Sequence, residues 1–348
     1  MERIREGVDM PLEERELVTV EVVSDVQPIP GADAIEMVTV RGWRVATRIG
    51  EFAVGDPCLY FEIDSLLPVG DPRFAFLAPR GTKQVDGVSY HRLKTARLRG
   101  AYSQGLVMPI SAFPGIYVTR ESLQEAMGVI KYDPPAVTAR SDIVGPFPAH
   151  LGQKTDSERV QNLASVWHEI VESGPWTPTE KVDGTSMSVF RDREGVLRVC
   201  GRNYEIAEGA NLYWNAVTRH RLGDFLEPGH GLQCEIFGEG VQGNPLGAQG
   251  VRVAVFDFLV EGKPQPRDKW PEKLEVRAVP VLDLDFPVSV ADAVAQADRV
   301  DSAITPGRLA EGIVWHQSEG NPVAALGYRT TFKVVSNRYL LKHDDKDK

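Results

Sequence analysis

The feature that most constrains the fold is a series of short, strand-like segments separated by turns near the N-terminus. Residues 17–23 are rich in β-branched side chains, and the turn-forming run Pro28-Ile29-Pro30-Gly31 follows them. The same pattern continues over residues 35–40, 43–49 and 58–63. Five or so short strands in about 100 residues predict a small closed β-barrel.

The length and one Pro/Gly-rich run predict two domains. A chain of 348 residues is long enough for about two separate cores. The run Gly145-Pro146-Phe147-Pro148 is typical of a linker, which we assign to residues 141–152. We therefore expect a barrel of the oligonucleotide-binding (OB) type over residues 1–140 and a second domain over residues 153–348.

The second domain is predicted to begin with a helix and to continue mainly as strands. Asp156 is placed to cap a helix whose apolar residues recur at helical spacing as far as Ile170. Strands are predicted over residues 185–191, 196–201, 232–237, 251–260, 312–316 and 330–336. Turns such as Asp183-Gly184 favour antiparallel neighbours. The predicted fold class is α+β, an OB-like barrel followed by antiparallel sheets with flanking helices.

Composition excludes several classes of protein. The sequence has no run of about 18 apolar residues that would span a membrane, and residues 1–6 lack the apolar core of a signal peptide, so we expect a cytoplasmic protein. Three cysteines without a CxxC pair predict neither a disulfide framework nor a zinc site. A net charge of −10 argues against general binding of nucleic acid, so any such surface must be local.

One local basic surface is visible in the predicted barrel. Cations accumulate between residues 80 and 99, with tyrosine and histidine rings among them. We predict that Arg92, Lys94, Arg97 and Arg99 bind nucleic acid, because cations can follow the phosphates while bases stack on the rings. A solvated loop and strand face is the alternative interpretation.

A run in the second domain carries the strongest chemical signal. It reads Glu180-Lys181-Val182-Asp183-Gly184, although Lys-x-Asp-Gly alone is a weak motif. Further segments follow in order at residues 201–205, 235–238, 255–258, 311–314 and 332–336. Together they resemble motifs I, Ia, III, IIIa, IV and V of the covalent nucleotidyltransferases, which include DNA ligases, RNA ligases and mRNA capping enzymes. Residues 154–163 and 332–342 with the leading barrel resemble, more narrowly, the Deinococcus-type nick-sealing RNA ligases.

The resemblance identifies Lys181 as a nucleophile. In this superfamily a lysine attacks the α-phosphate of ATP, expels pyrophosphate and becomes a lysyl-AMP. The attacking amine must be neutral, whereas a lysine in water has a pKa of about 10.4. Burial, a neighbouring cation such as Lys333 and a bound divalent metal ion lower that pKa. Lys333 is also expected to contact the α-phosphate.

The resemblance implies roles for five other residues. Glu180 is placed near the adenine edge, through its backbone or its side chain. Arg202 contacts a phosphate or the ribose, for which the guanidinium fork is well suited. Glu235 accepts hydrogen bonds from the ribose hydroxyls, and Glu311 binds the divalent metal ion. Phe256 stacks on adenine, although its apolar strand fits a core residue too.

One position departs from the family pattern. Many members carry a second motif V lysine two residues after the first, where this chain has Val335. Lys154, Arg338 and Lys342 are the candidates for the missing phosphate contact, and the sequence does not choose among them.

The sequence thus predicts an ATP-dependent RNA ligase that uses Mg²⁺ or Mn²⁺. It is expected to seal 3′-hydroxyl/5′-phosphate nicks in a duplex with RNA at the 3′-hydroxyl end. The alternatives are a capping-type guanylyltransferase, a DNA ligase, and a non-catalytic nucleic-acid-binding protein with an inactive ligase-like domain. The retained Lys181, Glu235, Glu311 and Lys333 speak against the last of these.

Overall fold

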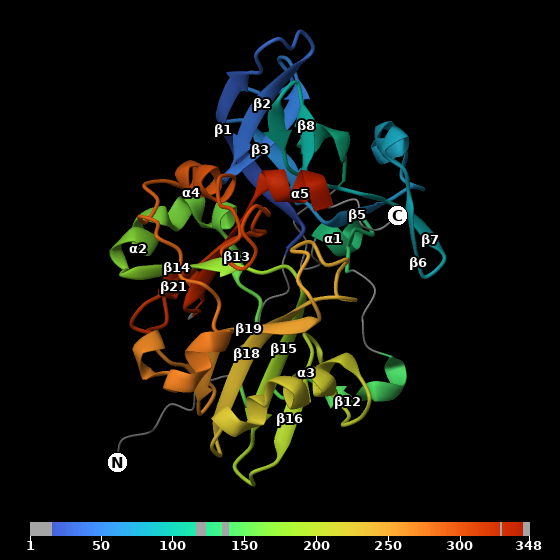
Figure 1. Cartoon of the computed structure of the whole chain (residues 1–348). Helices are drawn as coiled ribbons and strands as arrows, with labels where there is room; N and C mark the ends of the chain where they lie inside the picture. Colours follow the sequence, from blue (N-terminus) through green and yellow to red (C-terminus); the bar gives the residue numbers. More distant parts are fainter. Residues whose placement is uncertain (1–15, 116–122, 134–138, 328, 344–348) are drawn as a thin grey trace, which may run out of the picture. The chain divides into compact units, whose positions relative to one another are not determined.

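The computed structural model describes residues 16–115, 123–133, 139–327 and 329–343, and the chain divides into two compact units, Met1–Tyr132 and Asp133–Lys348 (Figure 1). The boundary therefore lies earlier than the Pro/Gly-rich run. Residues 141–152, predicted as a linker, belong to the second unit. The reason is that β12 (Ile143–Pro146) pairs there with β17 (Tyr204–Ile206).

The first unit contains the predicted small barrel. Its main antiparallel sheet has the order β10-β4-β1-β2-β3. The strands are β1 (Val18–Pro28), β2 (Ile35–Val40), β3 (Trp43–Arg48), β4 (Pro57–Phe61) and β10 (Leu106–Pro109). The register of β1 against β2 shifts between Val23 and Asp25, an irregularity of the kind that bends a strand. The N–H of Gln104, just before β10, donates to the carbonyl of Arg44 on β3 at 2.8 Å and thus connects the two outer strands.

The rest of the first unit packs beside this sheet. A second sheet has the order β11-β5-β7-β6, and β8 and β9 form a separate hairpin. These elements are β5 (Ser65–Pro68), β6 (Lys83–Val85), β7 (Val88–Arg92), β8 (Ala96–Leu98), β9 (Ala101–Ser103), β11 (Ile130–Lys131), η1 (Pro72–Arg80), η2 (Ile110–Ala112) and α1 (Leu123–Ala126). Phe61, Phe74 and Phe113 meet in the core, with ring centroids 5.5, 5.9 and 6.3 Å apart. Burial of these rings stabilises the packing of η1 against the barrel.

The larger sheet of the second unit has seven strands in the order β12-β17-β16-β15-β18-β19-β20. Its other strands are β15 (Thr185–Arg191), β16 (Leu197–Cys200), β18 (His230–Gly238), β19 (Val251–Val260) and β20 (Lys263–Pro264). β15 and β19 have the bounds that the sequence predicts. The helix α3 (Leu212–His220) lies against this sheet (Figure 1) and buries Tyr213, Ala216 and Val217 in the shared core.

The smaller sheet has the order β13-β22-β21-β14. Its strands are β13 (Glu158–Arg159), β14 (Trp176–Lys181), β21 (Gly312–Gln317) and β22 (Thr331–Val335). The helices η4 (Val160–Val166), α2 (Trp167–Glu172) and α4 (Val290–Ala297) pack on it through a core that includes Trp315 and Phe332. The remaining helices are η3 (Arg140–Asp142), η5 (Leu222–Phe225), η6 (Arg267–Lys269), η7 (Glu272–Arg277), η8 (Ala324–Leu326) and α5 (Asn337–His343).

The predicted helix at the start of the second domain begins later than expected. Glu158 and Arg159 form β13 beside β22, and the helical segment starts only at Val160. Asp156 does not cap it, because its carboxylate is held by the guanidinium of Arg202 at 2.7 Å. The residue that the sequence suggested as a helix cap, Asp156, therefore forms a long-range ion pair with Arg202 instead.

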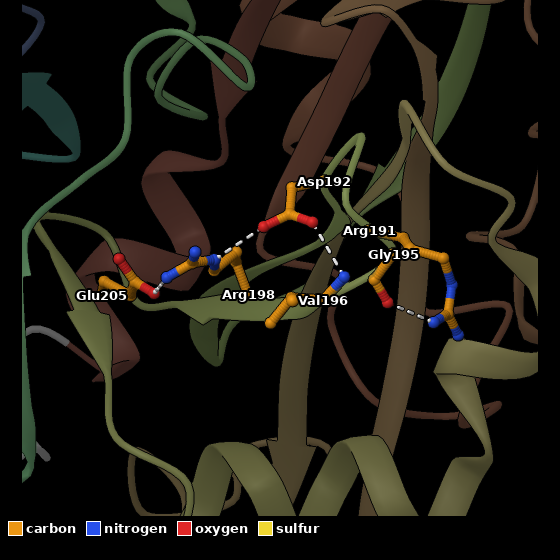
Figure 2. A network of polar contacts seen from close by, with 6 residues as sticks. All are labelled: Arg191, Asp192, Gly195, Val196, Arg198 and Glu205. Atoms are coloured by element: carbon orange, nitrogen blue, oxygen red, sulfur yellow. Dashed lines mark hydrogen bonds and ion pairs between the residues drawn. The ribbon is translucent and has the colours of Figure 1, made fainter.

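A polar network fixes the two strands on either side of Arg202. Arg198 on β16 pairs with Asp192 at 3.0 Å and with Glu205 on β17 at 3.2 Å (Figure 2). Asp192 also accepts from the backbone N–H of Val196 at 2.8 Å. Arg198 therefore connects the turn between β15 and β16 with β17, which begins where the loop after β16 ends. Arg202 lies in that loop.

The two strands β21 and β22 approach each other so closely at Gly312 that no side chain fits. A Cβ there would clash with the carbonyl oxygen of Val334, which is backbone and cannot rotate away. We expect Gly312→Ala to destabilise the protein by about 1–3 kcal/mol, the usual range for overpacking. The measurement is thermal unfolding. Gly145→Ala is the matched control, because a Cβ on Gly145 meets nothing within 4 Å; equal losses in both variants would contradict the close approach.

Candidate active site

The candidate site lies where the chain passes from the smaller to the larger sheet of the second unit. β14 ends at Lys181, and the next three residues lead into β15. The register of β14 against β21 places Lys181 opposite Gly312, the residue after Glu311. The Nζ atom of Lys181 consequently lies 2.6 Å from Oε2 of Glu311. Strand pairing thus brings together two motifs that are 130 residues apart.

Glu235 reaches the same point from β18. β15 and β18 pair with Ser186 opposite Glu235, and the nearby backbone N–H of Gly184 favours the ionised form of the Glu235 carboxylate. A Cβ on Gly184 would clash with the carbonyl oxygen of Ile236. The glycine of Lys-x-Asp-Gly is therefore required by the close approach that brings Glu235 near Lys181.

Three carboxylates surround Lys181 and determine its protonation. Burial tends to lower the pKa of this lysine, but Glu311, Glu235 and Asp183 outweigh burial and leave the pKa raised. Burial raises the pKa of Glu235 to about 8, against the opposing charge of Lys181. Lys181 is therefore protonated in this arrangement and must lose a proton before it can act as a nucleophile.

Lys333 joins this cluster from β22. It lies opposite Val314 on β21, and its charge favours the ionised form of Glu311. The structure therefore brings Lys181, Glu235, Glu311 and Lys333 close together. Three of them lie on β14, β18 and β22, and Glu311 directly precedes β21.

Glu180 differs from the prediction in the use of its side chain. It is 1% exposed, and its carboxylate accepts hydrogen bonds from the hydroxyl of Ser302 at 2.5 Å and from the N–H of Ala303 at 2.8 Å. The side chain thus holds the loop after α4 and is not presented to a ligand. Ile304 in that loop packs in the same apolar cluster as Phe256.

Phe256 occupies a β-bulge. Gln233 and Cys234 are adjacent on β18, yet they face Asp257 and Val255 on β19, so Phe256 is the extra residue. Bulges redirect a side chain and are common beside active sites. Phe256 is half-buried, which fits a ring that is seated on the core but still offers a surface for stacking.

Arg202 lies against the segment that precedes the first helical turn. Its guanidinium binds Asp156 through two nitrogens, at 2.7 and 3.2 Å. Lys154 lies beside it, with Nζ 3.1 Å from the side-chain oxygen of Asn203. Arg338, by contrast, donates to the carbonyl of Asp298 at 2.9 Å. Of the candidates for the missing phosphate contact, Lys154 therefore adjoins Arg202, whereas Arg338 is bound to Asp298.

The predicted basic surface of the first unit is divided by the fold. Arg92 is only 10% exposed, pairs with Asp64 at 2.8 Å and lies 3.8 Å over the ring of Tyr132. The guanidinium of Arg92 is therefore engaged in contacts within the first unit. Arg97 and Arg99 are exposed on the β8–β9 hairpin, and Lys94 is half-buried.

Sequence reasoning missed a buried polar pair next to Phe256. Nδ1 of His316 lies 3.9 Å from Oδ1 of Asp257, and Nε2 of His316 lies 3.0 Å from the hydroxyl of Thr179. Burial raises the pKa of Asp257 to about 7, while burial and Arg267 lower the pKa of His316 to about 4. His316 is therefore neutral near pH 7. An aspartate inside an apolar strand was the only signal available in the sequence.

The described part of the chain offers no cluster of three His, Cys, Asp or Glu side chains arranged to enclose a metal ion. Within the same residues, no helix is long and apolar enough to cross a membrane.

Comparisons with known proteins agree with this geometry. The family model described as RNA ligase matches residues 174–335, and one described as an OB-fold domain matches residues 17–110. No curated protein matches the chain. Solved structures of Naegleria gruberi RNA ligase are similar over 95% of this chain and 100% of theirs. The structure with PPi has 34% identity and a TM-score of 0.82, a variant with AMP and Mn has 33% and 0.82, and a variant with ATP and Mn has 33% and 0.83.

The raised pKa of Asp257 predicts how stability depends on pH. The carboxyl keeps its proton up to about pH 7 in the folded chain but loses it near 3.8 when unfolded. The folded state thus binds more protons between these values, so this group lowers stability as the pH rises through that window. We expect Asp257→Asn, which cannot ionise, to gain in melting temperature relative to the parent from pH 5 to pH 8. A constant difference across that range would show that Asp257 titrates normally.

Proposed function

Because the chain belongs to the RNA ligase family, we propose that it is an ATP-dependent RNA ligase that seals nicks through a lysyl-AMP intermediate on Lys181. The observation that carries this proposal is the contact of Lys181 with Glu311, with Glu235, Asp183 and Lys333 around it. Structures of the similar Naegleria gruberi RNA ligase that contain ATP and Mn, AMP and Mn, or PPi support ATP and a divalent cation as cofactors.

The first step joins AMP to the protein. The neutral amine of Lys181 attacks the α-phosphorus of ATP, a P–N bond forms, and the P–O bond to the departing pyrophosphate breaks. Lys333 is placed to stabilise negative charge on the α-phosphate as the bond order changes. The proton of Lys181 must leave first, which requires that the contact of its ammonium with Glu311 be broken.

The nucleoside is proposed to lie between Phe256, the strand that carries Glu235 and the loop that carries Arg202. The ring of Phe256 offers a face for adenine, and the Glu235 carboxylate is an acceptor for ribose hydroxyls. Arg202 is suited to a phosphate oxygen, because its fork presents two parallel N–H donors. The backbone of Glu180, rather than its buried carboxylate, is the remaining group near the expected adenine edge.

The residues present fit a divalent cation bound on few protein ligands. Mg²⁺ and Mn²⁺ accept one or two carboxylates together with substrate oxygens and water. Glu311 supplies such a carboxylate, because its side chain is 15% exposed and is held by the ammonium of Lys181, which a cation can replace. When bound, the cation would neutralise phosphate charge.

The later steps return the lysine to its starting form. An oxygen of the 5′-phosphate displaces Lys181 from AMP, so the P–N bond breaks and the amine takes up a proton. The 3′-hydroxyl then attacks the activated phosphate, and AMP leaves. We propose that the duplex carries RNA at this 3′-hydroxyl end and that Lys94, Arg97 and Arg99 contact its phosphates.

The covalent intermediate can be tested directly. Incubation with ATP labelled on the α-phosphate and Mn²⁺ should place label on the denatured protein. Lys181→Ala and Lys181→Arg should abolish it, because neither side chain offers a neutral amine. Glu311→Ala and Lys333→Ala should lower it by at least about 100-fold, the usual order for loss of one electrostatic group. Normal label on either Lys181 variant would exclude this lysine as the nucleophile, and label from GTP alone would indicate a guanylyltransferase.

The nucleic-acid surface can be tested separately from the nucleotide site. A variant with alanine at Lys94, Arg97 and Arg99 should bind a nicked duplex more weakly and with a smaller salt dependence, since each lost phosphate contact removes released counterions. Its labelling by ATP should be unchanged. Arg92→Ala is excluded from this set because Arg92 supports the fold. Parental binding by the variant would refute the surface, and faster sealing of an all-DNA nick than of one with a 3′-RNA end would favour a DNA ligase.

A further inference from the structure

A buried tyrosine on α5 contacts the aspartate of the Lys-x-Asp-Gly motif. The hydroxyl of Tyr339 donates to Oδ2 of Asp183 at 2.6 Å. Tyr339 is 4% exposed, and burial together with Asp183 and Glu311 raises its pKa, so the hydroxyl keeps its proton and acts as a donor. A hydrogen bond this short between a hydroxyl and a carboxyl oxygen belongs to the stronger class.

The helix that carries Tyr339 is itself fixed at its first turn. The side chain of Asp298, directly after α4, accepts from the hydroxyl of Ser336 at 3.0 Å and from the N–H of Arg338 at 3.3 Å. The hydroxyl of Ser336 also accepts from the N–H of Tyr339 at 3.2 Å. Tyr339 is therefore held by the end of another helix, independently of Asp183.

The same turn contacts the backbone at Glu311. The N–H of Ser336 donates to the carbonyl oxygen of Glu311 at 2.9 Å. One short segment, Ser336 to Tyr339, thus touches two of the three acidic residues around Lys181, Glu311 through its backbone and Asp183 through its side chain. Lys333 lies only three residues before this segment.

The charges around Asp183 explain why its contact with Tyr339 matters. Asp183 acts on the pKa values of Lys181, Glu235 and Glu311, so its carboxylate lies within their electrostatic range. A carboxylate in such a cluster is attracted by Lys181 and repelled by Glu311. A fixed donor on its far oxygen restricts it to one orientation, and the approach of Lys181 to the α-phosphate depends on geometry at the level of about 1 Å.

We propose that Tyr339 is a positioning residue for adenylation, because its hydroxyl holds Asp183 in the orientation that Lys181 requires. This role rests on the proposed function. With this role α5 contributes to the site, although it lies outside the motif segments.

The test is a double-mutant cycle read in the labelling step. Tyr339→Phe keeps the buried ring and removes only the hydroxyl. In single-turnover labelling at saturating ATP and Mn²⁺, we expect its rate to fall about 10- to 100-fold while the ATP concentration for half-maximal rate changes less than about 3-fold. Asp183→Ala should be slower still, and Tyr339→Phe should slow the Asp183→Ala protein by less than about 2-fold, because the hydroxyl acts through Asp183.

His343→Ala is the matched control. Its ring lies 4.4 Å from that of Tyr339, so the substitution disturbs the surroundings of the tyrosine but leaves the hydroxyl in place. We expect its labelling rate to stay within about 3-fold of the parent. A general disturbance of α5 would slow this variant as well.

The outcomes separate this role from the proposed function. If the parent protein is labelled and Tyr339→Phe is labelled at the parental rate, the positioning role is overturned and the proposed function stands. If the fold-reductions in labelling rate of the two substitutions multiply in the double variant, Tyr339 does not act through Asp183 and the positioning role is equally overturned. If the parent itself takes no label, the proposed function fails and this role fails with it.

Discussion

The ion pair between Lys181 and Glu311 is the interaction on which the candidate site depends. It exists because β14 and β21 pair in one register, and a shift of one residue would turn the two side chains to different faces of the sheet. In the same contact, a carboxylate holds the lysine in its charged, non-nucleophilic form. The fold thus places the nucleophile Lys181 next to Glu311, the carboxylate that keeps it protonated. Binding of the substrate has to separate the lysine from this carboxylate.

Two sheets of the second unit share the task of building the site. The smaller sheet supplies Lys181 and Lys333, and the larger sheet supplies Glu235 and Phe256. Gly184 and Gly312 lie at the points where backbones approach too closely for any side chain. The sheet with the lysines is covered by helices and an aromatic core that includes Trp315 and Phe332, which is the rigid support that charged groups at short distances require.

The strands and the charged motif residues could be predicted from the sequence, because both depend on local signals. Alternation and β-branched residues indicate strands such as β15 and β19, and the ordered motifs indicate Lys181, Glu235, Glu311 and Lys333. Long-range pairing was not visible. Asp156 had the local signature of a helix cap but is bound by Arg202, and Arg92 belonged to a basic run but is paired with Asp64. The partners of Glu180 and Tyr339 lie more than 100 residues away.

The bulge at Phe256 has a consequence for how this chain can vary. Because side chains alternate along a strand, one extra residue reverses the alternation, and β19 follows one phase before Phe256 and the other after it. Exchanging one side chain for another in this stretch leaves that phase intact. Removing the extra residue would make the pairing of β18 and β19 continuous and would leave both arms on their present faces, but it would abolish the bulge that presents Phe256. The extra residue itself is therefore the property of β19 that variation must preserve.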